Sequence, residues 1–265
     1  MTMTTKPTYV CGVGLWTPGY ANPKSWCDGE ADAEKPKPAA TLLKGPLSRR
    51  ATPLTRMSIE AMQQAVAMGD ADLSTIPSVW ATCHGEHSAA ISLLRMMQEG
   101  EGKLSPTKFH NSVHNAASGY ASIATGNRTL STTLTGGAEI VASSLLEAIC
   151  LVQSLDRSIV LVLADEPLLP PFERSDATTG LALSLLLSSN ADGAFAALDG
   201  LRRGTVPPLE HTDYFGSLHV SAALPLIERI VKGRSGTVAL DFKADSRKAV
   251  WCMDLEVLES FPTEL

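Results

Sequence analysis

Four residues that could bind metals or carry out covalent chemistry stand together in the segment CHGEH at positions 83–87. Cys83, His84, Glu86 and His87 supply a thiol, two imidazoles and a carboxylate, which are common zinc ligands and common partners in Cys/His catalysis. Neighbouring residues on a strand point to opposite faces, so Cys83 and His84 do not readily converge on one atom. The segment is therefore predicted to turn from a strand into a helix over 88–98.

Two further histidines, His110 and His114, have the i, i+4 spacing of a helical pair in FHNSVHNAASG. Two imidazoles on one helix face form half of a zinc site, but no glutamate or third ligand completes an H-E-x-x-H pattern. Asp165 and Glu166 follow a strongly apolar run, where we expect them to cap the end of a strand. The sequence therefore predicts no metal site in either place.

The segment GVGLWTPG at 12–19 has the first two glycines of a dinucleotide-binding loop but carries Thr17 where the third glycine belongs. The residues that follow also lack the helix that would receive a pyrophosphate group. We predict a strand that ends in a Gly/Pro turn, and no bound cofactor.

The segment TTLTGGAEIVASSLLEA at 132–148 has the order of a catalytic elbow, with a β-like run, a Gly-Gly turn and an amphipathic helix. Enzymes place nucleophiles at such turns because the positive end of the helix dipole favours an anion. Here Gly136, Gly137, Ala138 and Glu139 occupy the turn, and none of them is a serine or a cysteine. The elbow is therefore predicted to lack a nucleophilic side chain.

Short β-branched and apolar runs alternate along the chain with longer segments of helical spacing. Strands are predicted over 8–15, 78–85, 130–135, 158–166 and 180–188. Helices are predicted over 54–68 and 139–153, and after residue 190 over 217–233, before a hairpin built from GTVALDFKA and KAVWCMDLEV. This pattern predicts an α/β fold with a mixed central sheet covered by helices.

The composition excludes several classes of function. The chain has 265 residues and a net charge of −6, so nucleic acid is not the expected partner. No apolar run is long enough to span a membrane, and the first residues lack a signal-peptide core. Five scattered cysteines without a CxxC pair predict a reduced, cytoplasmic protein. The basic group Lys44, Arg49 and Arg50 is either a solvated loop or a patch for an acidic carrier protein.

Three segments together resemble the N-terminal half of a β-ketoacyl synthase with the thiolase-like fold. They are YVCGVGLWTPG, SPTKFHNSVHNAASGYASIATGNR and LSTTLTGGAEIVASSLLEA, and in the second of them Asn115, Gly119, Gly126 and Arg128 fall in the family's register. The resemblance covers residues 8–190 and is greatest to the small, cysteine-less synthase-like subunits of polyene and polyketide systems. It implies a ketosynthase-like N-terminal domain over 1–190 and a reduced C-terminal lobe over 191–265, packed on the same core.

The same resemblance implies that the chain has no catalytic residues of its own. It places Ala138 at the position of the nucleophilic cysteine, with Gly137 and Glu139 on either side. Ser217 falls where the family has a catalytic histidine, although His219 lies two residues further on and a shift of register would restore it. Alanine cannot carry an acyl thioester, so condensation is not expected from this chain alone.

By the resemblance, the chain pairs with a catalytic ketosynthase as a chain-length-factor-type subunit and meets an acyl carrier protein only indirectly. The strand over 130–135, with Leu130, Thr132 and Leu134, is then expected at the interface. The residues expected to face the partner or its acyl tunnel are Phe109, His110, Val113 and His114.

Three questions stay open at the level of sequence. Glu139 is either stabilised by the helix dipole, by about 0.3–1 kcal/mol, or occupies a vestigial pocket with a chemical role. The chain could instead be a stand-alone acyltransferase or condensing enzyme that uses Cys83 or His84. It could also be a homodimeric acyl-binding scaffold.

Overall fold

The computed structural model describes residues 6–34, 37–100, 104–172, 179–206, 215–216, 218–242 and 248–262. Its centre is a single mixed sheet with the strand order β3-β2-β4-β5-β1-β6-β8-β7. The strands are β1 Thr8–Trp16, β2 Ser78–Thr82, β3 Ser131–Thr135, β4 Ile159–Asp165, β5 Leu181–Ser188, β6 Ala196–Gly204, β7 Gly236–Ala239 and β8 Val250–Val257. β2 pairs in parallel with β3 and β4, whereas β5 runs antiparallel to both β4 and β1.

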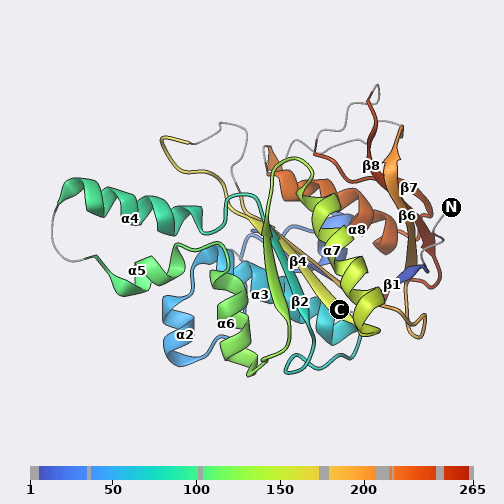
Figure 1. Ribbon diagram of the computed structural model, residues 1–265, viewed down its shortest axis with the longest axis horizontal. Helices are drawn as coiled ribbons and strands as arrows, with labels where there is room; N and C mark the ends of the chain where they lie inside the picture. The colour runs from blue at the N-terminus through green and yellow to red at the C-terminus, as the bar shows by residue number, and fades with distance from the viewer. Residues whose placement is uncertain are drawn as a thin grey trace.

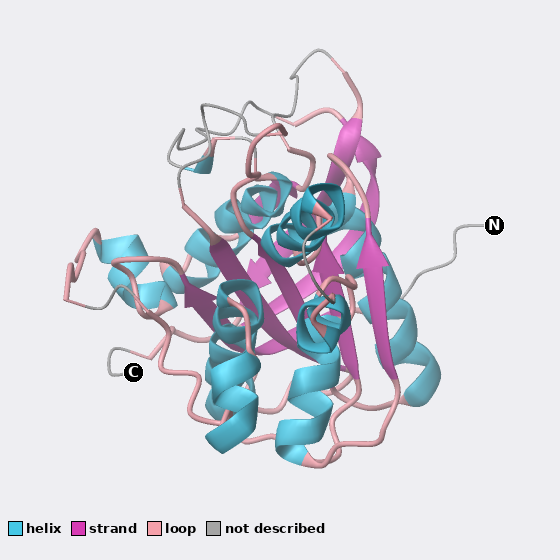
Figure 2. Cartoon of the chain, turned by 90° about the vertical axis from the view of Figure 1, so that its left-hand side faces the viewer, coloured by secondary structure: helices cyan, strands magenta, loops and turns pink. Residues whose placement is uncertain are grey.

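Helices cover both faces of this sheet (Figure 2). The helices are α1 Pro23–Asp28, α2 Gly45–Arg50, α3 Pro53–Met68, α4 His87–Glu99, α5 Pro106–Asn111, α6 Ala116–Thr125, α7 Ile140–Leu155 and α8 Leu224–Val231, and the 3₁₀ helix η2 is His219–Ala223. The alternation of buried residues along the strands assigns α3 and α6 to one face, and α7, η2 and α8 to the other. The predicted α/β architecture is confirmed.

The G-x-G pair near the start of the chain has a packing role. A Cβ at Gly12 would lie 2.0 Å from the carbonyl oxygen of Ala65, and a Cβ at Gly14 would lie 2.0 Å from that of Ala61. Only glycine allows α3 to approach β1 so closely. This contact gives Gly12 and Gly14 a packing role.

Several predicted elements need correction. The strand predicted over 78–85 ends at Thr82, and the helix predicted over 217–233 consists of η2 followed by α8. The predicted hairpin is present as the antiparallel pair β7 and β8. The strand β6 was not predicted, because Asp199, Gly200, Arg202 and Arg203 give it a polar character and its pairing with β8 is interrupted between Asp199 and Arg202.

A helical arm, formed by α4 and α5, projects from the side of the sheet at the left of Figure 1. It leaves the body just after β2 and returns before α6. At its base, Gly85 has a φ of +60°, and a Cβ there would lie only 3.1 Å from the Cα atom of His114. Both ends of the arm therefore meet at this contact. In the part of the chain that the structure describes, no helix is both long and apolar enough to cross a membrane.

Candidate functional site

The elbow between β3 and α7 is formed by residues 136–139, all of which are exposed. Glu139 is the N-cap residue of α7, and its side chain makes no capping hydrogen bond. The positive end of a 16-residue helix therefore faces the turn, as it would in an enzyme that stabilises an anion there. Gly136, Gly137, Ala138 and Glu139 offer no thiol or hydroxyl to use it.

Glu139 is held by two strands of the C-terminal part of the sheet. Its Oε1 accepts a hydrogen bond from Nη1 of Arg203 at 2.7 Å, and its Oε2 accepts one from Nε1 of Trp251 at 3.2 Å. The Arg203 guanidinium lies 5.6 Å from the centre of the Trp251 ring, in a cation–π arrangement. The hydrogen bond from Arg203 lowers the pKa of Glu139, with a further contribution from Trp251. Glu139 is thus an ionised group that ties the elbow to β6 and β8.

Two histidines lie close to the same turn. The backbone N–H of Phe242 donates to the carbonyl oxygen of Ala138 at 3.1 Å, and the Phe242 ring packs against His219 with centroids 4.6 Å apart. The centroids of His219 and His84 are 6.5 Å apart. The structure therefore brings His84 and His219 to the elbow. Ser217, the predicted vestigial histidine position, lies outside the described residues.

Cys83 also approaches the elbow, but as a thiol. Its Sγ lies 3.8 Å from the carbonyl oxygen of Gly137, to which it donates a weak hydrogen bond. Burial raises the pKa of Cys83, and the negative charge of Asp165 raises it further. A nucleophilic cysteine needs the opposite environment, because the thiolate is the reactive form. Among the described residues no hydrogen bond joins the side chains of Cys83 and His84.

Asp165 fixes the turn between β2 and α4. The side chain is completely buried and accepts hydrogen bonds from Oγ1 of Thr82 at 2.7 Å and from the backbone N–H groups of Cys83 at 2.9 Å and His84 at 3.3 Å. This is the strand-end cap that the sequence predicted for Asp165, made across to a neighbouring strand. Glu166 does the same for α4 and accepts from the backbone N–H of Ser88 at 2.7 Å.

Glu86, one of the four potential metal-binding or catalytic residues of the segment at 83–87, is a buried carboxylate. Its Oε1 accepts hydrogen bonds from the hydroxyls of Thr52 at 2.8 Å and Thr55 at 2.6 Å, while its buried Oε2 has no partner in the described structure. Burial raises the pKa of Glu86 to about 7, against the two threonine hydrogen bonds. Its only sequence signal was a carboxylate inside a short turn between two apolar segments.

The arm carries the residues that the resemblance assigned to a partner's tunnel. Phe109 is 62% exposed and Val113 is 41% exposed, and His110 and His114 are exposed as well. The two histidines do not share a helix, since α5 ends at Asn111 and His114 lies in the turn that leads into α6. No cluster of three or more metal-ligating side chains occurs in the described ranges.

Among the described strands β3 forms the edge of the sheet, so it pairs with a neighbour, β2, on one side only. Leu130 is 46% exposed, and Thr132 and Leu134 are half-buried. Leu134 packs against the core on the α7 side. An open, partly apolar edge is a surface on which another strand can pair.

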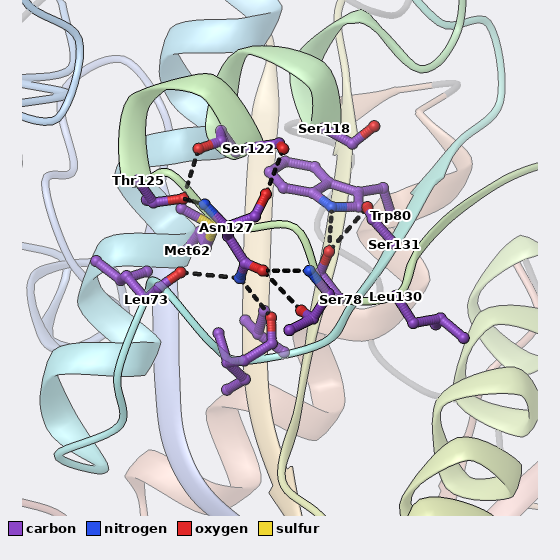
Figure 3. A pocket seen from close by; sticks show the side chains of 14 residues that line it. Met62, Leu73, Ser78, Trp80, Ser118, Ser122, Thr125, Asn127, Leu130 and Ser131 are labelled. Atoms are coloured by element: carbon purple, nitrogen blue, oxygen red, sulfur yellow. Dashed lines mark hydrogen bonds between the residues drawn. The ribbon is translucent and has the colours of Figure 1, made fainter.

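A polar seam lies beneath this edge strand, around a cavity of about 30 Å³ (Figure 3). Nε1 of Trp80 donates to Oγ of Ser78, which in turn donates to Oγ of Ser131 on β3, each at 2.9 Å. Asn127 closes the turn before β3, with Nδ2 donating to the carbonyl oxygens of Leu73 and Ile76. Hydroxyls and one amide thus hold the start of β3 in place.

Residues 23–249 match the sequence model of the family described as "Beta-ketoacyl synthase, N-terminal domain". The chain belongs to this family. A search among curated proteins finds no match.

Solved structures show the same fold. The ketosynthase ApeO in complex with its chain length factor ApeC, from Xenorhabdus doucetiae, aligns with a TM-score of 0.69 and 19% identity over 96% of this chain and 100% of that one. The ishigamide ketosynthase/chain length factor aligns with a TM-score of 0.71 and 14% identity over the same shares. A type II polyketide synthase structure, AntDE:AntF, aligns at 0.69 with 12% identity, again over 96% and 100%. The predicted thiolase-like ketosynthase fold is confirmed.

The elbow of this family member has no serine or cysteine among residues 136–139. The turn keeps the strand, the glycines and the helix N-terminus. It is contacted by the Cys83 thiol and by the backbone N–H of Phe242, whose ring packs against His219. The contacts that Arg203 and Trp251 make with Glu139 had no signal in the sequence, because these residues lie 64 and 112 positions away from it.

Proposed function

We propose that the chain is a non-catalytic, chain-length-factor-type subunit that pairs with an active β-ketoacyl synthase and shapes its acyl tunnel. The pathway we propose is polyene or polyketide biosynthesis, or a related fatty-acid-like process. In this role the acyl carrier protein meets the catalytic partner and contacts this chain only indirectly.

The main observation behind the proposal is that the elbow has no serine or cysteine and that its residues are bonded to other parts of the chain. Glu139 is paired with Arg203 and Trp251, and the carbonyl oxygen of Ala138 is bonded to Phe242. Thioester formation needs an attacking thiolate or alkoxide at this turn. The nearest thiol, Cys83, is kept protonated by burial and by Asp165, which raise its pKa.

Exposed apolar side chains are consistent with a partner that binds β3 and the arm. Exposed large apolar side chains lie on α4, on α5 and its following turn, and just before β3; they are Leu94, Met97, Phe109, Val113 and Leu130. Exposed apolar surface of this kind can serve as an interaction site. The structural relatives ApeO–ApeC and the ishigamide enzyme are described as a ketosynthase with a chain length factor. By analogy we propose the same type of partner here.

A homodimeric scaffold is the main alternative, since the edge of β3 could pair with a second copy of the chain. A stand-alone acyltransferase based on Cys83 or His84 is less well supported, because the Cys83 thiol has a raised pKa and donates to Gly137. Under our proposal the boundary near residue 190 and a reducing, cytoplasmic setting also stay predictions. The five cysteines are free.

The test is to co-express the chain with a ketosynthase that has the complete Cys-His-His set and to measure the mass of the purified complex by light scattering. We expect a one-to-one heterodimer that is weakened by Leu130→Asp at the edge of β3. Leu155→Asp, at a similarly exposed leucine at the end of α7, should not weaken it. A homodimer that ignores the ketosynthase would contradict the proposal.

A further inference from the structure

A cavity of about 570 Å³ lies away from the elbow, at the carboxyl end of β1 and the N-terminus of α3. The elbow leads into α7, which packs on the opposite face of the sheet from α3. The cavity is therefore separate from the vestigial site. Its volume falls in the range of about 300–1,000 Å³ that is typical of small-molecule sites.

The walls of the cavity are mainly apolar and are built on rigid elements. Trp16, at the end of β1, is 5% exposed, and Met57, on the first turns of α3, is 3% exposed. Four prolines complete the apolar lining; they are Pro18, Pro38, Pro53 and Pro167. Such walls suit a flat or extended apolar body.

The polar groups of the lining favour an anion. Arg56 and Lys37 bring two positive charges, and α3 directs its N-terminus to the same place. The Arg56 guanidinium is oriented by a hydrogen bond from Nη2 to the carbonyl oxygen of Ser48. Because a guanidinium has five N–H donors, others are left for a ligand.

Two further groups point to a ligand with hydrogen-bond acceptors. Trp16, whose indole N–H can donate one hydrogen bond, lines the cavity with an almost completely buried side chain. Glu166 is the one acid among the described lining residues, and it is buried and bonded to the N–H of Ser88. Burial raises the pKa of Glu166.

We propose that this cavity binds a small organic anion that has one carboxylate and an apolar body. The carboxylate pairs with Arg56 at the N-terminus of α3, and the apolar body lies against Trp16 and Met57. This site goes beyond the proposed function, because it needs neither the partner subunit nor the elbow.

The test uses octanoate as the probe and 1-octanol as its uncharged counterpart, with calorimetry and tryptophan fluorescence of the isolated chain. We expect saturable binding of octanoate that is weakened about tenfold or more by Arg56→Gln, because one charge-assisted contact is lost. Trp16→Phe should remove most of the fluorescence change. Arg157→Gln, which changes an exposed arginine bonded to the carbonyl oxygen of Thr75, should bind as the parent does.

Lys37→Gln serves as a second variant, since Lys37 is exposed and its replacement does not disturb the anchoring of α2 by Arg56. It should weaken octanoate binding by a smaller factor than Arg56→Gln. Equal affinity for octanoate and 1-octanol would overturn the proposal, as would binding that both charge variants leave unchanged. Failure to saturate with octanoate would do the same. None of these outcomes depends on whether a ketosynthase partner is found.

Discussion

The elbow and the arm both lie in the part of the chain between β2 and α7, yet they are built in opposite ways. At the elbow, Glu139 and Ala138 are exposed but bonded to residues of β6, β8 and the segment after β7. On the arm, Phe109 and Val113 are exposed apolar side chains. The chain thus uses its own contacts to close the place where chemistry would occur and leaves its apolar surface open on the arm. This difference is what the proposed role as a non-catalytic subunit with a partner requires.

The largest effect on stability is expected from Asp165, the buried carboxylate that holds the turn between β2 and α4. Asp165→Ala should lower the free energy of unfolding by about 3 kcal/mol, because the N–H groups of Cys83 and His84 and the hydroxyl of Thr82 lose their acceptor. Urea denaturation measures this, with the exposed Asp192→Ala as the control. A loss as small as that of the control would show that the turn does not depend on Asp165.

Glu86, at the base of the arm, should make stability depend on pH. Its folded-state pKa of about 7 lies above the ordinary value of 4.5, so the folded state holds the proton more tightly than the unfolded state. The stabilisation is complete below pH 4.5 and is lost as the pH rises to about 7, by up to roughly 3 kcal/mol. The negative charge of Glu166 also raises the pKa of Glu86. Glu86 and His114 line a common cavity of about 20 Å³.

Glu86→Gln should abolish this part of the pH dependence and make the protein more stable than the parent above pH 7. Thermal unfolding between acidic and mildly alkaline pH measures the effect, and the exposed Glu256→Gln is the matched control. If Glu86→Gln follows the parent's pH profile, the carboxylate is not the titrating group.

Phe109→Ala should affect the binding of a ketosynthase partner but not the stability of the fold. Because the side chain is 62% exposed, the free energy of unfolding should change by less than about 0.5 kcal/mol. Binding of a ketosynthase should weaken by about 2 kcal/mol, as at an interface hot spot, and the partner's products should lengthen. Product analysis by mass spectrometry tests this, with Leu258→Ala as the control. Unchanged affinity and product length would remove Phe109 from the tunnel.

The smallest effect is expected at Glu139 itself. Its ion pair with Arg203 joins two side chains that are about half exposed, at 54% and 47%, so solvent and salt screen it. A double-mutant cycle of Glu139→Gln and Arg203→Gln should give a coupling energy below about 1 kcal/mol, decreasing with added salt. A much larger coupling would mean that the tie at the elbow supports more of the fold than its exposure indicates.

The sequence predicted the parts of the structure that depend on local pattern. The buried runs that became β1, β4 and β5 are nearly continuous apolar segments, and α3 and α7 have clear apolar stripes. The empty elbow was also visible, because it depends on which residues occupy one turn.

The remainder depends on contacts between distant residues, which a local pattern does not contain. The carboxylate of Glu86 is buried and accepts hydrogen bonds from Thr52 and Thr55, which belong to another segment. β6 forms from a polar stretch because β1 and β8 supply its hydrogen bonds. The end of α5 at Asn111, between His110 and His114, also involves distant contacts, because the Asn111 side chain is bonded to Arg50 and Tyr120.

The most direct test of a silent subunit is a reconstituted condensation assay with a ketosynthase partner, its acyl carrier protein and this chain. The account predicts that activity needs the ketosynthase cysteine and that Cys83→Ser in this chain leaves the rate unchanged. It also predicts no acyl transfer by this chain alone. Acyl transfer by the isolated chain that Cys83→Ser abolishes would contradict the account.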